Sequence, residues 1–347
     1  MPTDTRSSQH QQLLDPDLAD TVRMSVAEAT ALGERALRTL GYPADEARII
    51  VDQLIDNALC GYKFAGLPRI LAIADDVKSR DARSPVRIVH ETPVSALLDG
   101  GNNVGYIAAY RGAEVAIRKV REMGIASVGV HNSYFSGRNA YYVERIVDAG
   151  YFAFHVACGQ PLVVPAGGAK PAFGTNPISF GFPSDNGPVV VDLGTASIMS
   201  GEVKLHALLG LPLPEGVGFD RDGRPSRDAA AVVHGGVSAF GGHKGYALCF
   251  AIQAMGLLAG AALTRNRVQD YGFLFIALNP DIMLPGQNFK AQMAELVRAV
   301  KATPRQPGVD EIRIPSERAY RERDRRRIEG IVLERKVIEA LEALQPL

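Results

Sequence analysis

The residues Gly241-Gly242-His243-Lys244-Gly245 precede an apolar run, Tyr246 to Leu263, that only Gln253 interrupts. Glycines let a backbone approach a ligand closely, and a helix that begins beside them points free amide groups at that ligand. His243 and Lys244 add hydrogen-bond donors and positive charge. We therefore predict a phosphate-binding turn at the start of a buried helix. A tight turn with Lys244 in solvent is the alternative that these residues alone leave open.

The apolar run after this turn is of marginal length for a membrane span. It has 18 residues, whereas a hydrocarbon core about 30 Å thick needs about 20. Gly256 and Gly260 suit close packing against a neighbouring element. The chain has no second run of this kind, and its mean hydropathy is close to zero. We expect a fully buried helix and no membrane partner.

The composition is that of an ordinary globular chain. Its length of 347 residues is enough for a large core and about two domains. Hydrophobic residues make up 46% and charged residues 22% of the chain, as in other globular proteins. Lys and Arg together number 38, the same as Asp and Glu. This balance gives no overall field that would attract nucleic acid or an anionic membrane.

The cysteines and the N-terminus indicate where the protein works. Cys60, Cys158 and Cys249 are scattered, form no C-x-x-C pair and lie among apolar neighbours. A reducing compartment is the simplest inference from this pattern. The N-terminal dozen residues are polar and lack the apolar region of a signal peptide. We therefore expect a disordered tail over residues 1–20 and a cytoplasmic protein.

Hydrophobic periodicity predicts a mixed α/β chain, α+β in its arrangement. Helices are expected from Ser25 to Leu59 with a break at Gly41-Tyr42-Pro43, from Asn103 to Met123, from Ala140 to Ala149, from Phe289 to Lys301, and from Arg323 to Leu344. Buried strands are expected at Ile125 to Val130, Tyr151 to Ala157, Val189 to Asp192, and Phe273 to Leu278. We expect a helical region over residues 21–120, joined by C-terminal helices over residues 300–347, around an α/β domain over residues 121–299.

The common catalytic signatures are absent from the sequence. No G-x-G-x-x-G follows a strand, so the Rossmann fingerprint is missing. Gly236 and Gly241 have the spacing of a P-loop, but Gly242 and His243 then occupy the places of its Lys and Ser/Thr. No two of the seven histidines stand at metal-ligand spacing with a carboxylate or thiolate, so we expect no metal site.

Two clusters of small and polar residues remain as candidate sites. Gly174-Thr175-Asn176-Pro177 offers a hydroxyl and an amide at a turn whose backbone Pro177 restricts. The stretch from Asp192 to Ser197 ends a strand with an acceptor and continues with small donors, which suits a sugar hydroxyl or an amide. Each cluster taken singly is also compatible with a turn whose polar groups bond one another.

Taken in order along the chain, these blocks resemble the malate/L-lactate dehydrogenase family of non-Rossmann oxidoreductases. The blocks are V-V-P-A-G-G-A-K-P-A-F-G-T-N-P-I-S-F-G-F-P from Val163 to Pro183, V-D-L-G-T-A-S from Val191, L-P-E-G from Leu213, F-G-G-H-K-G from Phe240, and I-P-S-E-R from Ile314. The resemblance extends from about Ser25 to Leu344. Within the family, the P-E-G-x-G-x-D-x-D-G-x-P loop from Pro214 to Pro225 is most similar to the Δ1-piperideine-2-carboxylate/Δ1-pyrroline-2-carboxylate reductases.

The resemblance implies a non-Rossmann NAD(P)-binding α/β domain, a helical domain formed by both terminal segments, and a homodimer. It implies NADPH, or NADH, as cofactor, with Thr175 and Asn176 near the nicotinamide. The basic residues Arg318 and Arg321 suit a pyrophosphate or a 2′-phosphate. By position, the implied cofactor contacts are Phe135, Ser136, Gly137, Arg138, Asn139, Thr175, Asn176, Asp192, Leu193, Gly194, His243, Lys244, Arg318, Tyr320 and Arg321.

The chain departs from the family where protons are transferred. Family members usually carry G-x-x-S-H-G-x-x-R, in which the Ser-His pair moves a proton and the Arg holds the substrate carboxylate. Here Phe64 and Ala65 occupy the Ser-His positions, and Arg69 is retained. A second family histidine, in N-S-x-H-F-G, is replaced by Phe135. The implied substrate contacts are Phe64, Ala65, Arg69, Pro161, Ser200 and Gly201.

These replacements favour reduction of a C=N bond over reduction of a ketone. Hydride reduction of a ketone gives an alkoxide that must be protonated, and a positioned general acid contributes about 10² to 10⁴-fold. A cyclic imine is protonated before the hydride arrives, so it needs a cofactor, a carboxylate clamp and a dry pocket. We therefore expect reduction of the C=N bond of a cyclic imino acid, or of a bulkier intermediate of the same kind. Substitute acids beside the vacated positions are Lys63, Tyr62 and Tyr134. The resemblance adds Glu202, which stands where relatives carry an acidic residue near the substrate.

Two other functions stay open from the sequence. One is a 2-hydroxy acid dehydrogenase of the malate or lactate type that uses one of these substitute acids. The other is a cofactor-binding protein with altered or lost redox chemistry, in which the segment from Tyr62 to Gly66 forms an interaction surface.

Overall fold

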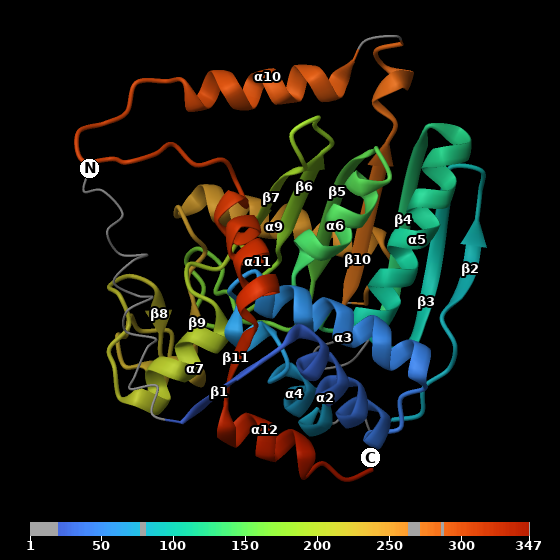
Figure 1. Ribbon diagram of the computed structural model, residues 1–347. Coiled ribbons are helices and arrows are strands. Elements are labelled where there is room, and N and C mark those ends of the chain that lie inside the picture. Colours follow the sequence, from blue (N-terminus) through green and yellow to red (C-terminus); the bar gives the residue numbers. More distant parts are fainter. Residues whose placement is uncertain (1–19, 77–80, 263–270, 286–287, 347) are drawn as a thin grey trace.

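The computed structural model describes residues 20–76, 81–262, 271–285 and 288–346, and its centre is a seven-stranded mixed sheet (Figure 1). The strand order is β2-β3-β4-β10-β5-β6-β7. β3 and β4 run parallel, and every other neighbouring pair is antiparallel. The strands are β2 (Arg87–Glu91), β3 (Ser95–Val104), β4 (Ile125–Tyr134), β5 (Phe152–Cys158), β6 (Ile178–Phe182), β7 (Val189–Leu193) and β10 (Gly272–Leu278).

Helices cover both faces of this sheet, because successive residues of its strands point to opposite sides. Phe273 and Phe275 of β10 pack against α5 (Gly105–Met123) and α6 (Asn139–Asp148). Leu274, between them, packs against Ile252 of α9 (His243–Leu258) on the other face. Figure 1 shows α5 and α6 in front of the strands and α9 behind them.

Glycine allows α9 to approach the sheet closely. A Cβ at Gly256 would lie 2.0 Å from the Cys158 Sγ on β5, which no side chain can tolerate. This close contact agrees with the packing role predicted for Gly256 from the sequence.

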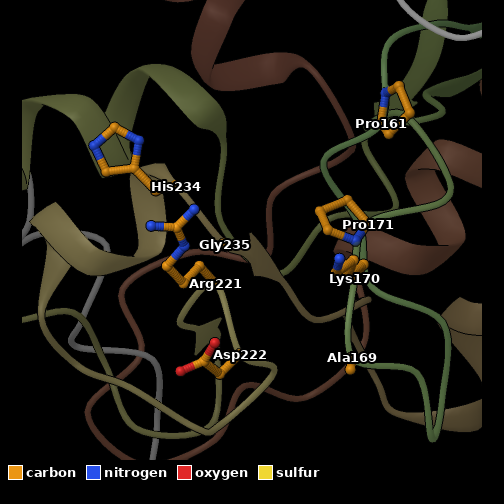
Figure 2. Close-up of a pocket in the computed structure, with 8 residues that line it drawn as sticks. All are labelled: Pro161, Ala169, Lys170, Pro171, Arg221, Asp222, His234 and Gly235. Carbon is orange, nitrogen blue, oxygen red and sulfur yellow. The ribbon is translucent and has the colours of Figure 1, made fainter.

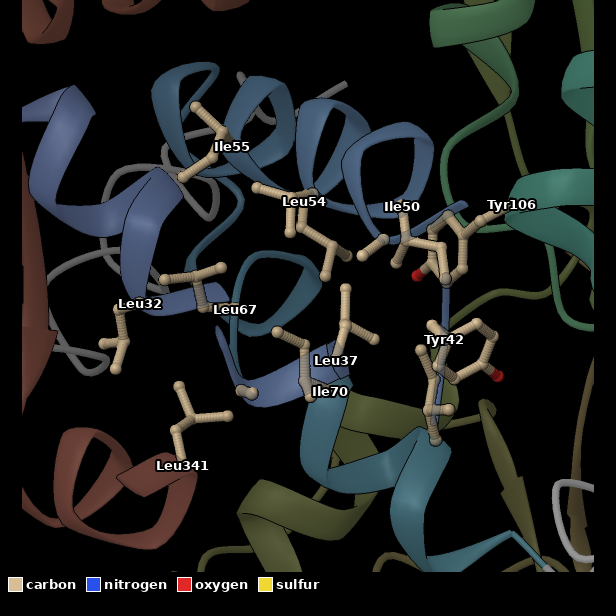
Figure 3. Close-up of a cluster of buried hydrophobic side chains, with 14 of the residues drawn as sticks. Leu32, Leu37, Tyr42, Ile50, Leu54, Ile55, Leu67, Ile70, Tyr106 and Leu341 are labelled. Carbon is tan, nitrogen blue, oxygen red and sulfur yellow. The ribbon is translucent and has the colours of Figure 1, made fainter. Parts of the chain in front are cut away.

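The two ends of the chain form a second, helical layer. α2 (Val26–Thr39), α3 (Ala44–Leu59) and α4 (Arg69–Asp75) pack with the C-terminal α12 (Arg335–Glu342). β1 (Thr21–Met24) pairs with β11 (Ile331–Glu334) in an antiparallel ribbon. The buried side chains of this layer include Leu32, Leu37, Ile50, Leu54, Ile70 and Leu341 (Figure 3).

The remaining elements lie between and beside these layers. They are η1 (Lys63–Ala65), α7 (Ser200–Leu209), β8 (Gly218–Phe219), α8 (Ala229–Val233), β9 (Gly236–Val237), η4 (Pro280–Ile282), α10 (Phe289–Lys301) and α11 (Glu317–Glu329). β8 and β9 pair with each other and form a small unit together with α7 and α8.

The structure corrects three expectations about elements. β2 and β3, within the region expected to be helical, belong to the central sheet. The single helix expected from Arg323 to Leu344 is instead α11, β11 and α12. Gly330 ends α11 because its φ is +90, and a Cβ there would lie 2.4 Å from the Met24 carbonyl oxygen. α9 is not fully buried, since Phe250 and Leu258 are 59% and 76% exposed.

Two further expectations concern the termini and the membrane. Residues 1–19, expected to be a disordered tail, lie outside the described residues. Among the residues that are described, no helix combines the length and apolar character needed to cross a bilayer.

His155 of β5 makes the stability of the fold sensitive to acid. Its ring is fully buried, stacks on Phe275 with 3.9 Å between centroids, and has no hydrogen-bond partner for Nε2 among the described residues. Burial lowers the pKa of His155 from 6.5 to about 3. The ring is therefore neutral in the folded protein. Its depressed pKa adds to the free energy of unfolding, and this stabilisation is full above pH 6.5 and is lost as the pH falls toward 3.

We expect a His155→Phe variant to lose less stability in acid than the wild type. Between pH 6.5 and 5, the wild type should lose about 2 kcal/mol more of unfolding free energy, since one proton is taken up on unfolding. Urea unfolding at each pH measures this difference. A His90→Gln variant, altered at an exposed position of β2, should follow the wild type. Parallel curves for the wild type and His155→Phe would contradict the prediction.

Candidate active site

Backbone hydrogen bonds bring three of the sequence blocks together. The Thr175 carbonyl oxygen accepts bonds from the Thr195 amide at 2.8 Å and from the Thr195 hydroxyl at 2.9 Å. The Phe240 amide donates to the Thr195 carbonyl oxygen at 2.9 Å. The segments that begin at Thr175, Asp192 and Phe240 are thus neighbours in space, although the sequence separates them widely.

Asp192 links this group to the start of α6. Its Oδ2 accepts a bond from the Ala140 amide at 2.9 Å, and its Oδ1 accepts a bond from the Ser179 hydroxyl at 2.5 Å. Burial raises the pKa of the Asp192 carboxyl, against the effect of these two bonds. The carboxyl group therefore holds the loop before α6 against the C-terminal end of β7.

The glycine-rich turn leaves the N-terminus of α9 open. Gly241 and Gly242 have φ angles of +59 and +63, and no atom lies within 4 Å of where their Cβ atoms would be. No side chain caps the helix, so its first amides are free to bind an anion. His243 and Lys244 are exposed there. A Cβ at Gly245 would lie 1.8 Å from the Phe240 carbonyl oxygen, so the turn requires glycine at that position.

Two buried amide side chains beside the segment of Asn176 and Pro177 have unsatisfied oxygens in the described part of the chain. Asn176 is 1% exposed, and its Nδ2 donates to the Cys249 carbonyl oxygen at 2.9 Å and to Gln253 Oε1 at 3.2 Å. Its Oδ1, and Oδ1 of Asn139, have no hydrogen-bond partner among the described residues. Buried acceptors of this kind call for a donor. The carboxamide of a nicotinamide supplies one, and with the open helix end these residues fit an NAD(P) cofactor.

Arg69 lies on the ring of Phe135. The guanidinium carbon is 4.5 Å from the ring centroid. Phe135 in turn meets Tyr106 and Tyr134 edge to face, with centroid distances of 6.1 and 5.3 Å. Arg69 also bonds the Tyr106 hydroxyl, whose pKa burial raises. These contacts restrict the guanidinium and leave it suited to holding a carboxylate.

Phe64 brings η1 to the start of α7. The Phe64 ring is 58% exposed, and a Cβ at Gly201 would lie 3.4 Å from its Cδ2. The first turn of α7 also contains Ser200 and Glu202. The predicted substrate contacts Phe64, Ser200 and Gly201 are therefore close together, with Glu202 beside them.

Three other predicted residues of this region differ in exposure. Lys63 is exposed, and the Ala65 carbonyl oxygen accepts a bond from Asn57 Nδ2 at 3.0 Å. Tyr134 is fully buried in the helical layer, where its side chain interacts with Tyr42 and burial raises its pKa. A hydroxyl in that position has no access to a substrate, contrary to the catalytic role predicted for Tyr134.

Arg138 is part of a buried group of four charges. Its guanidinium contacts Asp56, bonds Glu144 at 3.2 Å and bonds Asn57 Oδ1 at 3.0 Å. Arg323 of α11 bonds the same two carboxylates, at 3.0 Å to Asp56 and 2.5 Å to Glu144. The Arg138 side chain is 9% exposed. The structure thus places its charge inside the protein, contrary to the predicted cofactor contact, and adds Asp56, Glu144 and Arg323 to the site's surroundings.

The arginines of α11 differ in their partners. Arg321 bonds Glu311 at 2.8 Å and Glu317 at 2.7 Å, so the phosphate predicted to bind Arg321 would compete with two carboxylates for it. Arg318 lies 5.5 Å over the Tyr62 ring and has no carboxylate partner in the described part of the chain. The Tyr320 ring lies under Arg323, and burial raises the pKa of its hydroxyl. Arg318 is therefore the arginine of this helix that is available to an anion.

The other predicted cofactor residues differ in their surroundings. The Ser136 carbonyl oxygen accepts bonds from the Tyr142 hydroxyl at 2.6 Å and from Gln53 Nε2 at 2.9 Å. Gly137 is exposed and has a φ of +76. The Leu193 side chain is 36% exposed, and Gly194 follows it. In the described ranges, no group of three potential metal ligands was found.

Pro161 lies apart from this group. It lines a cavity of about 890 Å³ together with Ala169, Lys170, Pro171, Arg221, Asp222, His234 and Gly235 (Figure 2). No other predicted site residue contributes to that cavity.

Comparisons with known proteins agree with this architecture. The family model described as malate/L-lactate dehydrogenase matches residues 24–342. The chain is 33% identical to an L-sulfolactate dehydrogenase of Methanothermobacter thermautotrophicus, over 92% of this chain and 95% of that protein. It is 31% identical to a Δ1-pyrroline-2-carboxylate reductase of Ancylobacter novellus, over 94% and 98%. The Δ1-piperideine-2-carboxylate reductase structure from Pseudomonas syringae superposes with a TM-score of 0.83 at 28% identity, covering 92% and 99%.

The fold and these matches define an NAD(P)-dependent oxidoreductase. The chain belongs to the malate/L-lactate dehydrogenase family. The similar identities to a sulfolactate dehydrogenase and to a pyrroline carboxylate reductase leave the substrate to be argued from the site.

Proposed function

We propose that this enzyme uses NADPH to reduce the C=N bond of a cyclic imino acid similar to Δ1-pyrroline- or Δ1-piperideine-2-carboxylate. The observation that carries the proposal is the surroundings of Arg69. The guanidinium lies on Phe135, and Phe64 and Ala65 occupy the positions where the family resemblance places a proton-donating Ser-His pair. A carboxylate clamp is present, while these apolar side chains replace the acids that a ketone needs. The reductases among the relatives support the same reading.

The residues would act by binding and by excluding water. Arg69 holds the substrate carboxylate, and the rings of Phe64 and Phe135 supply an apolar wall beside the C=N bond. When bound, NADPH supplies a hydride to the imine carbon. The imine nitrogen already carries a proton from solvent, so the hydride completes a neutral C–H bond and an amine without a further acid. The two rings also suit a substrate that is bulkier than piperideine carboxylate.

Turnover of NADPH with cyclic imino acids and with 2-oxo acids tests the proposal. We expect oxidation of NADPH with the imino acids and little with the 2-oxo acids. Replacement of Arg69 by Ala should raise KM steeply, since a charge-assisted bond to a carboxylate is lost. An unchanged KM would show that the substrate carries no carboxylate. Cofactor binding without turnover of any imine at any pH would instead indicate a protein that has lost redox chemistry.

A second candidate function is a 2-hydroxy acid dehydrogenase. The sulfolactate and malate dehydrogenases among the relatives favour it. Glu202 in the first turn of α7, beside the Phe64 ring, would then be the proton donor, and Lys63 of η1 is the alternative. Reduction of 2-oxo acids at rates similar to those of imino acids, lost in a Glu202→Gln variant, would favour this function.

The unpaired charge of Arg318 leads to a prediction about the cofactor. An Arg318→Ala variant should bind NADPH about 10- to 100-fold more weakly, because one charge-assisted bond to a phosphate is lost. The matched variant Arg321→Ala should bind NADPH as the wild type does, since Glu311 and Glu317 already hold Arg321. Fluorescence titration measures both. If Arg318→Ala leaves NADH binding unchanged, Arg318 binds the 2′-phosphate of NADPH. If Arg318→Ala and Arg321→Ala weaken NADPH binding equally, the assignment of the phosphate contact to Arg318 is contradicted.

We also propose that the protein is a homodimer that works in the cytoplasm. The outward face of α9 is apolar, with Phe250, Leu257 and Leu258 exposed by 59%, 39% and 76%, and a second copy is the partner that the family resemblance implies. The three cysteines are buried and none of them is in a disulfide, which suits a reducing compartment.

Light scattering on the purified protein tests the dimer. The wild type should have twice the 37.2 kDa mass of one chain. A Leu258→Glu variant should have the mass of a monomer, whereas Ile328→Glu, at an 89% exposed position of α11, should remain a dimer. A monomeric wild type, or a dimer that Leu258→Glu leaves intact, would overturn this interface.

A further inference from the structure

The cavity of about 890 Å³ is lined by Pro161 and by residues of three further segments of the chain, and none of the predicted cofactor residues lines it. Lys170 and Pro171 come from the segment that leads into the G-T-N-P block, and Arg221 and Asp222 come from the loop between β8 and α8. His234 follows α8. Figure 2 shows the Lys170 side chain across the cavity from Arg221 and His234.

The charges on its walls are mostly positive. Lys170, Arg221 and His234 have no carboxylate partner in the described ranges of the chain, although all three are exposed. Asp222 is the one acidic residue of the lining, and Arg224 lies 3.4 Å from its carboxylate. Lys170 and Arg221, two unpaired cations on facing walls, favour an anionic occupant, and the His234 ring adds a hydrogen-bonding group beside Arg221.

The walls are fixed relative to each other. The Asp220 carboxylate accepts bonds from the Asp222 and Arg224 amides, both at 2.9 Å, which hold the turn that carries Arg221. Gly223 in this turn has a φ of +81, and a Cβ there would lie 2.6 Å from the Ala169 Cα. The turn therefore packs directly on the loop that carries Lys170, so the backbone segments that bear the two cations are held close together before a ligand arrives.

We propose that this cavity is a second binding site, for a small organic anion with at least two negative groups. Lys170 on one wall and Arg221 and His234 on the other would each hold an anionic group, and the rings of Pro161 and Pro171 would cover the carbon skeleton between them. The volume lies in the range of small-molecule sites. None of the cofactor residues lines the cavity, so the site is distinct from that of the nicotinamide and does not rest on the proposed reaction.

Isothermal titration of the full-length protein with inorganic pyrophosphate and with citrate tests the site and separates phosphate from carboxylate ligands. The double variant Lys170→Ala/Arg221→Ala should bind the preferred probe at least about tenfold more weakly than the wild type. Asp222→Asn should bind it about two- to fivefold more tightly, because the one negative charge of the lining is removed. Thermal unfolding checks that each variant is folded, and all three positions are exposed.

The matched control is Arg121→Ala, which removes an exposed cation from the last turn of α5. It should bind the probe as the wild type does. Three results would overturn the proposal: weakening by Arg121→Ala equal to that of the double variant, no binding of either probe to the wild type up to about 10 mM, or displacement of the probe by NADPH. The last result would assign the cavity to the cofactor's phosphates.

Discussion

Replacement of Asp56 by asparagine should lower the free energy of unfolding by about 3 to 5 kcal/mol, because it leaves a buried positive charge without its partner. Asp56 contacts both Arg138 and Arg323, and Glu144 contacts the same two arginines. The four side chains are between 9% and 17% exposed. Two negative and two positive charges balance in the wild type, whereas the variant retains one carboxylate between two guanidinium groups.

An exposed ion pair of α11 offers a matched control for this prediction. Glu311 bonds Arg321 of α11, but their side chains are 42% and 54% exposed. A Glu311→Gln variant should therefore change the unfolding free energy by no more than about 1 kcal/mol. Denaturant unfolding of both variants measures the difference. Equal losses of unfolding free energy in the two variants would contradict the prediction. They would mean that water screens the charges around Asp56 as it screens those of an exposed pair.

The network also connects the helical layer to the loop between β4 and α6, which we predict to contact the cofactor. Asp56 lies on α3, Arg138 precedes α6, and Arg323 lies on α11. Asn57, next to Asp56, bonds both Arg138 and the carbonyl of Ala65. A loss of the Asp56 charge should consequently weaken NADPH binding as well as stability, since the loop after Tyr134 would lose its anchor.

Local patterns account for the elements that the sequence predicted well. The helix expected from Phe289 to Lys301 has those bounds in the structure, and the strand expected from Phe273 to Leu278 differs from β10 by one residue. Both have a clear period or a continuous apolar run. β3 was missed because its sequence includes Asp99-Gly100-Gly101-Asn102-Asn103, which has the composition of a turn. Its pairing with β4 comes from tertiary contacts.

In the candidate site too, contacts between residues close in the sequence could be predicted, whereas contacts between distant residues could not. The spacing of Glu317 and Arg321 is i, i+4, a local signal that could have shown the pairing of this arginine. Asp56, Glu144 and Arg323 are separated by 88 residues or more, and no local pattern relates them. Only the packing of α3, α6 and α11 brings them together. The availability of Arg318 could therefore not be derived from the basic run that contains it.

Restoration of a proton donor should convert this site toward ketone reduction. In the double variant Phe64→Ser/Ala65→His, we expect kcat/KM for a 2-oxo acid to rise by about 10²-fold, the lower end of what a positioned general acid contributes. Reduction of cyclic imino acids should continue, because the imine nitrogen is protonated before the hydride arrives. Steady-state kinetics with both substrate classes measures the two changes.

The matched variant Phe64→Ala distinguishes the effect of the missing proton donor from the effect of the size of the Phe64 ring. The Phe64 ring lies on Gly201 at the start of α7, so its removal frees space beside Gly201 without adding an acid. If the missing donor is what excludes ketones, Phe64→Ala should gain little 2-oxo acid activity, and the double variant should gain much more. An equal gain in both variants would show that the ring excluded ketones by its size. No gain in either would mean that the pocket around Arg69 and Phe135 has diverged further, because the acid would then be present without a correctly placed substrate oxygen.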